Sequence, residues 1–161
     1  MVTRAKHWII AAIVATSAAG MPAAVGALSQ PHTVIGTGLV NEDGVVFRTT
    51  LLAASDARGR VSGAVVLNLD LTEFDLGITN VLSRVTCVHV VGSSAWIGAE
   101  AVYSSNQDII PNGTQTITFI RDGGRGGPDL MHGEPFDPPV SCTSEPSMPQ
   151  TQILNGEYQV R

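Results

Sequence analysis

Lysine is almost absent from this sequence: Lys6 is the only one in 161 residues, and it lies near the N-terminus. The chain has nine basic residues against 14 acidic ones. If a segment containing Arg4 and Lys6 is removed, seven basic residues remain against 14 acidic, a net charge of −7. An acidic domain without lysine repels the phosphates of nucleic acids and the headgroups of anionic lipids. The composition therefore argues against a nucleic-acid-binding domain.

Long apolar runs are also scarce. The N-terminal run WIIAAIVATSAA spans residues 8–19, which is 12 residues, whereas a membrane-spanning helix needs about 20. It follows the basic residues Arg4 and Lys6 and precedes small residues that end at Ala27. This order is typical of a secretory signal peptide. We expect residues 1–27 to form a cleaved signal helix, leaving no stable membrane span and placing the protein in the cell envelope or outside the cell.

Cysteine is rare as well, with only Cys87 and Cys142 in the chain. Both lie in the part that we expect to be exported, where disulfides persist. They are 142 minus 87, or 55, positions apart. A bridge that closes a loop of this size stabilises a fold by about 4 kcal/mol in the chain-entropy relation. We predict a Cys87–Cys142 disulfide, and the alternative is two buried free thiols.

What the sequence does contain is a series of short β-prone runs separated by turn residues. Such a series, without a convincing helix, is typical of an all-β fold, here a small antiparallel barrel or barrel-like sandwich. Residues 28–161 are expected to form this single domain, with a long Pro/Gly-rich loop over 122–149. A helix over 71–83 is disfavoured by Gly77 and its β-branched neighbours. The expected strands are 32–40, 45–54, 61–71, 81–91, 95–103 and 115–121, followed by a short hairpin or edge strand from 152–154 and 158–160.

His89 is the most suggestive single residue, because its strand alternates apolar and polar positions. A period of two places Val85, Cys87 and His89 on one face of the run 81–91, while Arg84 marks the other face as solvent-exposed. An inward His89 could bind a ligand in a barrel interior. The alternatives are a hydrogen-bonded core histidine or the opposite orientation.

Several motifs together resemble a known group of proteins. Residues 87–98 read C-x4-G-x2-A-x-I-G, the run 119–123 reads FIRDG, Asp129 follows, and 156–160 reads GEYQV. This order resembles small secreted bacterial β domains, actinobacterial in style, with a V-x-G-x-x-A-x-I-x-G hairpin and a D-x-G strand end. The group has no assigned function, so the resemblance implies a β fold and no activity.

Catalytic motifs are absent or incomplete. The stretch 92–95 (GSSA) lacks the second glycine of a G-x-S-x-G nucleophile turn. Asp70, Glu73 and Asp75 cluster as a glycosidase pair would, but few aromatic residues are present to stack on sugar rings. We assign no catalytic residue.

Metal-binding and cofactor motifs are equally weak. The glycine-rich stretch with Asp122 and Asp129 is similar to a calcium-binding repeat, but it occurs once, whereas such sites need stacked repeats. The histidines His32, His89 and His132 lie too far apart for a regular metal-ligand spacing. We assign no metal or cofactor.

These observations favour a secreted or envelope-associated, non-catalytic β domain that binds a partner protein or has a structural role. The alternative is a carrier of a small apolar ligand, with a barrel interior lined by Val65, Leu67, Val85 and His89. A hydrolytic enzyme is the least favoured interpretation.

Overall fold

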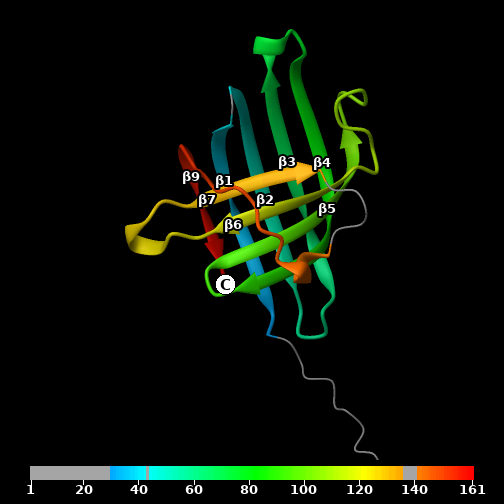
Figure 1. Cartoon of the computed structure of the whole chain (residues 1–161). Coiled ribbons are helices and arrows are strands. Elements are labelled where there is room, and N and C mark those ends of the chain that lie inside the picture. Colours follow the sequence, from blue (N-terminus) through cyan, green and yellow to red (C-terminus); the bar gives the residue numbers. More distant parts are fainter. Residues whose placement is uncertain (1–29, 43, 136–140) are drawn as a thin grey trace, which may run out of the picture.

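The computed structural model describes residues 30–42, 44–135 and 141–161. The predicted signal segment, residues 1–27, lies outside them. Most of the described residues belong to one antiparallel sheet with the strand order β8-β7-β6-β5-β4-β3-β2-β1-β9 (Figure 1). Its strands are β1 His32–Glu42, β2 Val45–Ser55, β3 Val61–Leu71, β4 Gly77–Val91, β5 Ser94–Ser104, β6 Gln115–Arg121, β7 Leu130–Pro135, β8 Thr151–Gln152 and β9 Asn155–Val160.

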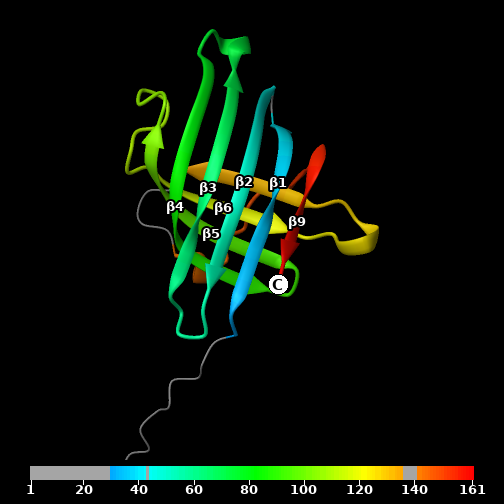
Figure 2. The same cartoon turned by 180° about the vertical axis from the view of Figure 1, so that it is seen from behind.

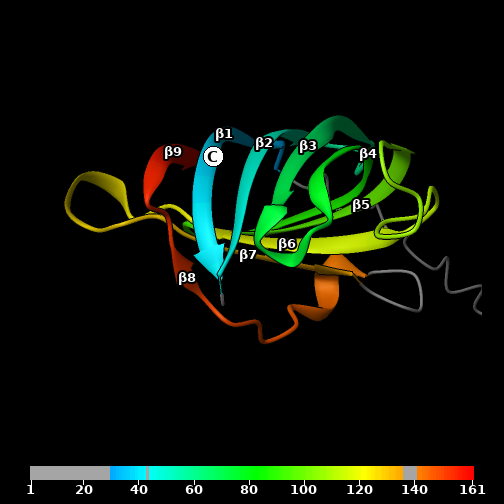
Figure 3. The same ribbon diagram turned by 90° about the horizontal axis from the view of Figure 1, so that it is seen from above.

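The sheet curls into a half-barrel with two layers. Strands β9, β1, β2, β3 and β4 arch over the layer that contains β5, β6 and β7 (Figure 3). Two register shifts interrupt the pairing of β4 with β5, at Thr86 and at Val102. An extra residue on one strand bends it and increases its twist, so these bulges help the sheet to turn from one layer into the other. The predicted all-β, barrel-like antiparallel fold is confirmed.

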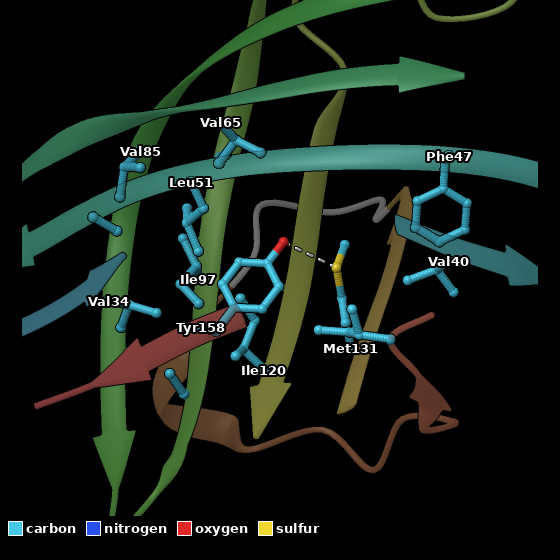
Figure 4. Packing of buried hydrophobic residues seen from close by; sticks show 14 residues of the cluster. Val34, Val40, Phe47, Leu51, Val65, Val85, Ile97, Ile120, Met131 and Tyr158 are labelled. Carbon is cyan, nitrogen blue, oxygen red and sulfur yellow. Dashed lines mark hydrogen bonds between the residues drawn. The ribbon is translucent and has the colours of Figure 1, made fainter. Parts of the chain in front are cut away.

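Tyr158 of β9 lies at the centre of the core between the layers (Figure 4). Its side chain is 1% exposed, and its hydroxyl donates to the Thr49 carbonyl at 3.1 Å and contacts Met131 Sδ at 3.4 Å. A Cβ at Gly36 or Gly38 would come within 2.6 or 2.8 Å of the Tyr158 ring. Glycine at these two positions of β1 therefore makes room for the ring.

Two carboxylates cover the free edge of β9. Asp129 accepts the backbone N–H of Tyr158 at 2.6 Å, and Asp122 accepts that of Val160 at 3.2 Å. Each carboxylate also accepts an N–H from its own glycine-rich loop. The aspartates thus replace a missing strand partner and join the β6–β7 loop to β9.

The structure differs from the predicted secondary structure mainly in two places. Leu130–Pro135 forms β7 inside the segment predicted as a long loop over 122–149, because Met131 faces the core opposite Ile120. The two last runs do not pair as a hairpin: β8 pairs with β7, and β9 pairs with β1. Within 71–83 the only helical residues are the 3-10 turn η1, Thr72–Phe74. Among the described residues no helix has the length and apolar character needed to cross a bilayer.

Candidate binding surface

The outer side of the β9–β1–β2–β3–β4 layer carries exposed apolar side chains (Figure 2 views this side). Solvent-facing positions of an antiparallel sheet are usually polar. Here Ile35, Leu52, Val66, Leu82 and Tyr103, one on each of β1 to β5, are between 38% and 57% exposed. We call these five residues, together with Ala64, the outer apolar face.

The strand register joins these side chains into one patch. Ile35 lies opposite Leu52, Val66 lies opposite Leu82, and Leu82 lies opposite Tyr103. Side chains directly opposite each other in an antiparallel pair are about 5 Å apart and contact one another. Leu52 and Val66 lie diagonally across β2 and β3 and both border the same hollow. The outer apolar face is therefore contiguous across the five strands.

An open hollow lies within the outer apolar face, over β1, β2 and β3. The hydroxyls of Thr37 and Thr50 hydrogen-bond to each other at 3.2 Å beside it, and Glu157 of β9 stands at its edge. Its surface is mainly apolar. The side chains around it include Ile35, Thr37, Thr50, Leu52, Ala64 and Val66.

Polar and charged residues surround this apolar centre. Arg84 pairs with Glu100 at 3.2 Å next to the patch, and the Arg84 side chain remains 66% exposed. Arg48 is exposed on β2, two residues from Thr50 and on the same face of the sheet. Glu157 is exposed on β9. An apolar centre with a polar rim is the organisation of protein–protein interfaces.

A second apolar surface, on the outer side of β5 and β6, is covered by the chain itself. Residues 141–150, which we call the strap, cross it. Met148 of the strap is buried against Trp96, Ile117 and Phe119. The Trp96 indole N–H donates to the Pro146 carbonyl at 3.2 Å. No described segment covers the outer apolar face in the same way.

The predicted disulfide between Cys87 and Cys142 is present and anchors the strap to β4, with the two Cα atoms 6.0 Å apart. The backbone N–H of Gly98 donates to Cys142 Sγ at 3.0 Å. A Cβ at Gly98 would lie 2.6 Å from Cys87 Sγ. Glycine at this position therefore leaves space for the disulfide.

His89 does not face the core, and of the orientations that the sequence left open the structure has the outward one. The extra residue Thr86 shifts the alternation of β4, so that Val88 and Val90 pack against the core and His89 points to the outer side. There His89 Nε2 lies 2.9 Å from a Glu145 carboxylate oxygen of the strap. His89 thus helps to hold the strap rather than to line the interior.

The other residues expected around a ligand lie in or against the packed core. Val65 and Val85 are buried members of the core cluster, and Leu67 packs against it. Their neighbours in that cluster include Leu51 and Tyr158, so these side chains contact other side chains (Figure 4).

The candidate catalytic carboxylates lie in an exposed turn. Glu73 and Asp75 are exposed in and after η1. Asp70 accepts hydrogen bonds from the hydroxyl and the backbone N–H of Thr72, and these lower the pKa of its carboxyl. The general acid of a glycosidase needs the opposite shift. These residues therefore give no support to glycosidase chemistry.

His132 of β7 takes part in a polar contact between strands. Its Nδ1 lies 3.1 Å from Glu42 Oε1 at the end of β1, and the Thr151 hydroxyl donates to the same oxygen at 2.6 Å. The contact joins β1, β7 and β8. Within the described ranges, no group of three or more His, Cys, Asp or Glu side chains is placed to hold a metal ion.

Comparison with known proteins gives no match: no protein family, no curated protein and no solved structure matches this chain. The resemblance to small secreted bacterial β domains therefore stays a prediction. The outer apolar face itself was missed in the sequence. Its signal was present, since Val66 and Leu82 interrupt the polar faces of their runs.

Proposed function

We propose that this chain is an exported, non-catalytic binding domain that holds a partner protein on its outer apolar face. The observation that carries the proposal is the contiguous patch of exposed apolar side chains across β1–β5. Contiguous apolar patches with polar rims on folded domains mark interaction sites. The signal-like N-terminus and the Cys87–Cys142 disulfide support the exported location.

The two layers differ in what covers their outer apolar surfaces. On the outer side of β5 and β6, Trp96 and Phe119 are covered by the strap, whose Met148 fills the surface. On the outer side of β2 and β3, Leu52 is 52% exposed and Val66 is 38% exposed. The fold covers one apolar outer surface with its own chain, so the uncovered one is available to another molecule.

A photo-crosslinking amino acid in place of Leu52, introduced in the producing cells, tests the proposal. Irradiation is expected to yield one discrete protein adduct, identified by mass spectrometry. The matched control places the same amino acid at Arg125, which is exposed on the loop between β6 and β7. An absence of adduct at Leu52, or the same adducts at both positions, would overturn the proposal.

A further inference from the structure

We infer that the partner on the outer apolar face is a protein with a positively charged surface, and that it also binds the tip of the β3–β4 hairpin. This tip, residues 71–78, enters an apolar pocket of the partner that has Arg or Lys side chains at its rim. The inference rests on the proposed function and gives the chemistry of the partner. Three properties of the hairpin tip support it: exposed apolar side chains, a backbone held by its own hydrogen bonds, and a surplus of negative charge.

The hairpin tip projects beyond the neighbouring strands (Figure 1). β2 pairs with β3 only as far as Asp70, and β5 pairs with β4 only as far as Val81. The apolar side chains at this end of the hairpin do not reach the core between the layers. Phe74, Leu76 and Ile78 are 52%, 54% and 61% exposed. Turns that face water are usually polar, and exposed apolar side chains that occur together mark an interaction site.

The backbone of the hairpin tip is held in one conformation. The Leu76 N–H donates to the Leu71 carbonyl at 3.2 Å, and the Asp75 N–H donates to the Thr72 carbonyl at 3.1 Å. The Asp70 carboxylate accepts the hydroxyl of Thr72 at 2.6 Å and its backbone N–H at 3.1 Å. Asp75 has a φ of 60°, in the left-handed region that few residues other than glycine adopt. A turn fixed in this way loses little conformational freedom when it binds.

The charge of the hairpin tip is negative. Residues 70–78 contain three carboxylates and no lysine or arginine. Glu73 and Asp75 are exposed on either side of Phe74, and neither makes an ion pair with a described residue. Complementary potentials across an interface favour association, and like charges oppose it. A partner that buries Phe74 therefore needs positive charge around its apolar pocket.

The same carboxylates argue against a lipid bilayer as the binding partner. If Phe74 entered the acyl region, Glu73 and Asp75 would lose water without gaining ion pairs, and burying an unpaired charge is costly. A protein pocket can instead place a cationic side chain beside each carboxylate. A protein therefore fits this combination of side chains better than a membrane does.

The hairpin tip is continuous with the outer apolar face along β4. Thr79 and Val81 are buried on one side of the strand, so Ile78, Asn80 and Leu82 share the other side. Leu82 belongs to the outer apolar face, and Ile78 lies four residues away, a distance of about 13 Å. A standard interface of about 800 Å² on each partner spans such a distance. One partner can therefore cover both surfaces.

Photo-crosslinking at Leu76 tests the inference, in parallel with the crosslink at Leu52. Both variants are expressed in the producing cells and irradiated, and the adducts are identified by mass spectrometry. We expect the same protein at both positions. The partner peptide that is joined at Leu76 is expected to lie beside Arg or Lys residues in the partner.

The affinity of purified variants for the captured protein tests the charge and the apolar contact separately. Glu73→Lys/Asp75→Asn keeps a residue that tolerates left-handed backbone at position 75. It is expected to weaken binding about tenfold at low ionic strength and less at high ionic strength. Phe74→Ser is expected to weaken binding about 30-fold. The matched control is Leu154→Ser, which removes an apolar side chain that is 65% exposed between β8 and β9, and it is expected to leave binding unchanged.

An unchanged Trp96 emission maximum and melting temperature verify that each variant is folded. No adduct at Leu76, a lipid adduct there, or a protein different from the one at Leu52 would overturn the inference. Binding that is insensitive to Glu73→Lys/Asp75→Asn would overturn it as well. If the Leu52 crosslink captures a protein and the Leu76 crosslink captures none, this inference fails and the proposed function stands. If the Leu52 crosslink captures nothing, both fail.

Discussion

Removal of the disulfide tests how the strap contributes to stability. The double variant Cys87→Ala/Cys142→Ala loses the covalent link between β4 and the strap and keeps the Met148 and Pro146 contacts. The bond closes a loop of 55 positions. The chain-entropy relation for a loop of that length gives a loss of about 4 kcal/mol in the free energy of unfolding. Domains of this size are stable by about 5–15 kcal/mol, so we expect the variant to fold with much lower stability.

Urea unfolding measures this loss, with Trp96 as the reporter. Of the two tryptophans, Trp8 lies in the segment expected to be cleaved on export, and Trp96 packs under the strap. The urea midpoint is expected to fall, and the slope m to rise, because the unfolded chain without the bridge is less compact. Wild-type protein treated with reductant is the matched control and should lose the same free energy. A loss below about 1 kcal/mol would refute the loop-closure reasoning.

Three further substitutions test contacts inside the fold. Asp129→Asn removes a carboxylate that accepts two backbone N–H groups and should lower the free energy of unfolding in urea by about 2 kcal/mol. The control Asp108→Asn changes an exposed carboxylate and should lower it by less than about 0.5 kcal/mol. Equal losses in the two variants would contradict the role of Asp129 in covering the edge of β9. Gly98→Ala places a methyl group against the disulfide and should cost about 1–3 kcal/mol, while Gly126→Ala, with open space around it, should not destabilise the fold. Burial, with a smaller contribution from the Asp129 carboxylate, raises the pKa of Tyr158 above the ordinary value of about 10. The folded state therefore holds this proton more tightly than the unfolded state does, so its contribution to stability is present below pH about 10 and is lost as the pH rises further. The melting temperature of the wild type should fall above that pH, and the melting temperature of Tyr158→Phe should fall less steeply. An identical decline in both proteins would show that Tyr158 does not cause the loss of stability.

Most strands could be predicted because their signals are local. Val61–Leu71 alternates apolar and polar residues, and the structure has β3 with the same bounds. Gln115–Arg121 likewise coincides with β6. β-branched runs between Gly- and Asp-containing turns fix strand position without long-range information. The fold class followed from these runs.

The orientation of His89 could not be predicted, because it depends on a bulge. A one-residue insertion reverses every side chain beyond it. Thr86 carries no distinctive signal in the sequence, and only its pairing with β5 shows that it is the extra residue. The disulfide could be predicted from the expected export of the chain and from its two cysteines. The strap that the disulfide anchors was recognisable in the sequence only as a Pro/Gly-rich segment.

The roles of Asp122 and Asp129 also depend on distant contacts. In the sequence they belong to a glycine-rich stretch that is similar to a calcium motif. In the structure they accept N–H groups from β9, 38 and 29 positions further along the chain. The outer apolar face was missed for a related reason, since it is assembled from one or two residues on each of five strands.

The central claim is that the outer apolar face binds a partner protein, and a crosslink that depends on this face tests it most directly. A photo-crosslinking amino acid at Val66 is compared in the wild-type background and in Leu52→Glu, after expression in the producing cells. The two residues lie on neighbouring strands of the same exposed patch. We predict a discrete adduct that Leu52→Glu abolishes. An adduct that persists unchanged in Leu52→Glu, or no adduct in either background, would contradict the claim.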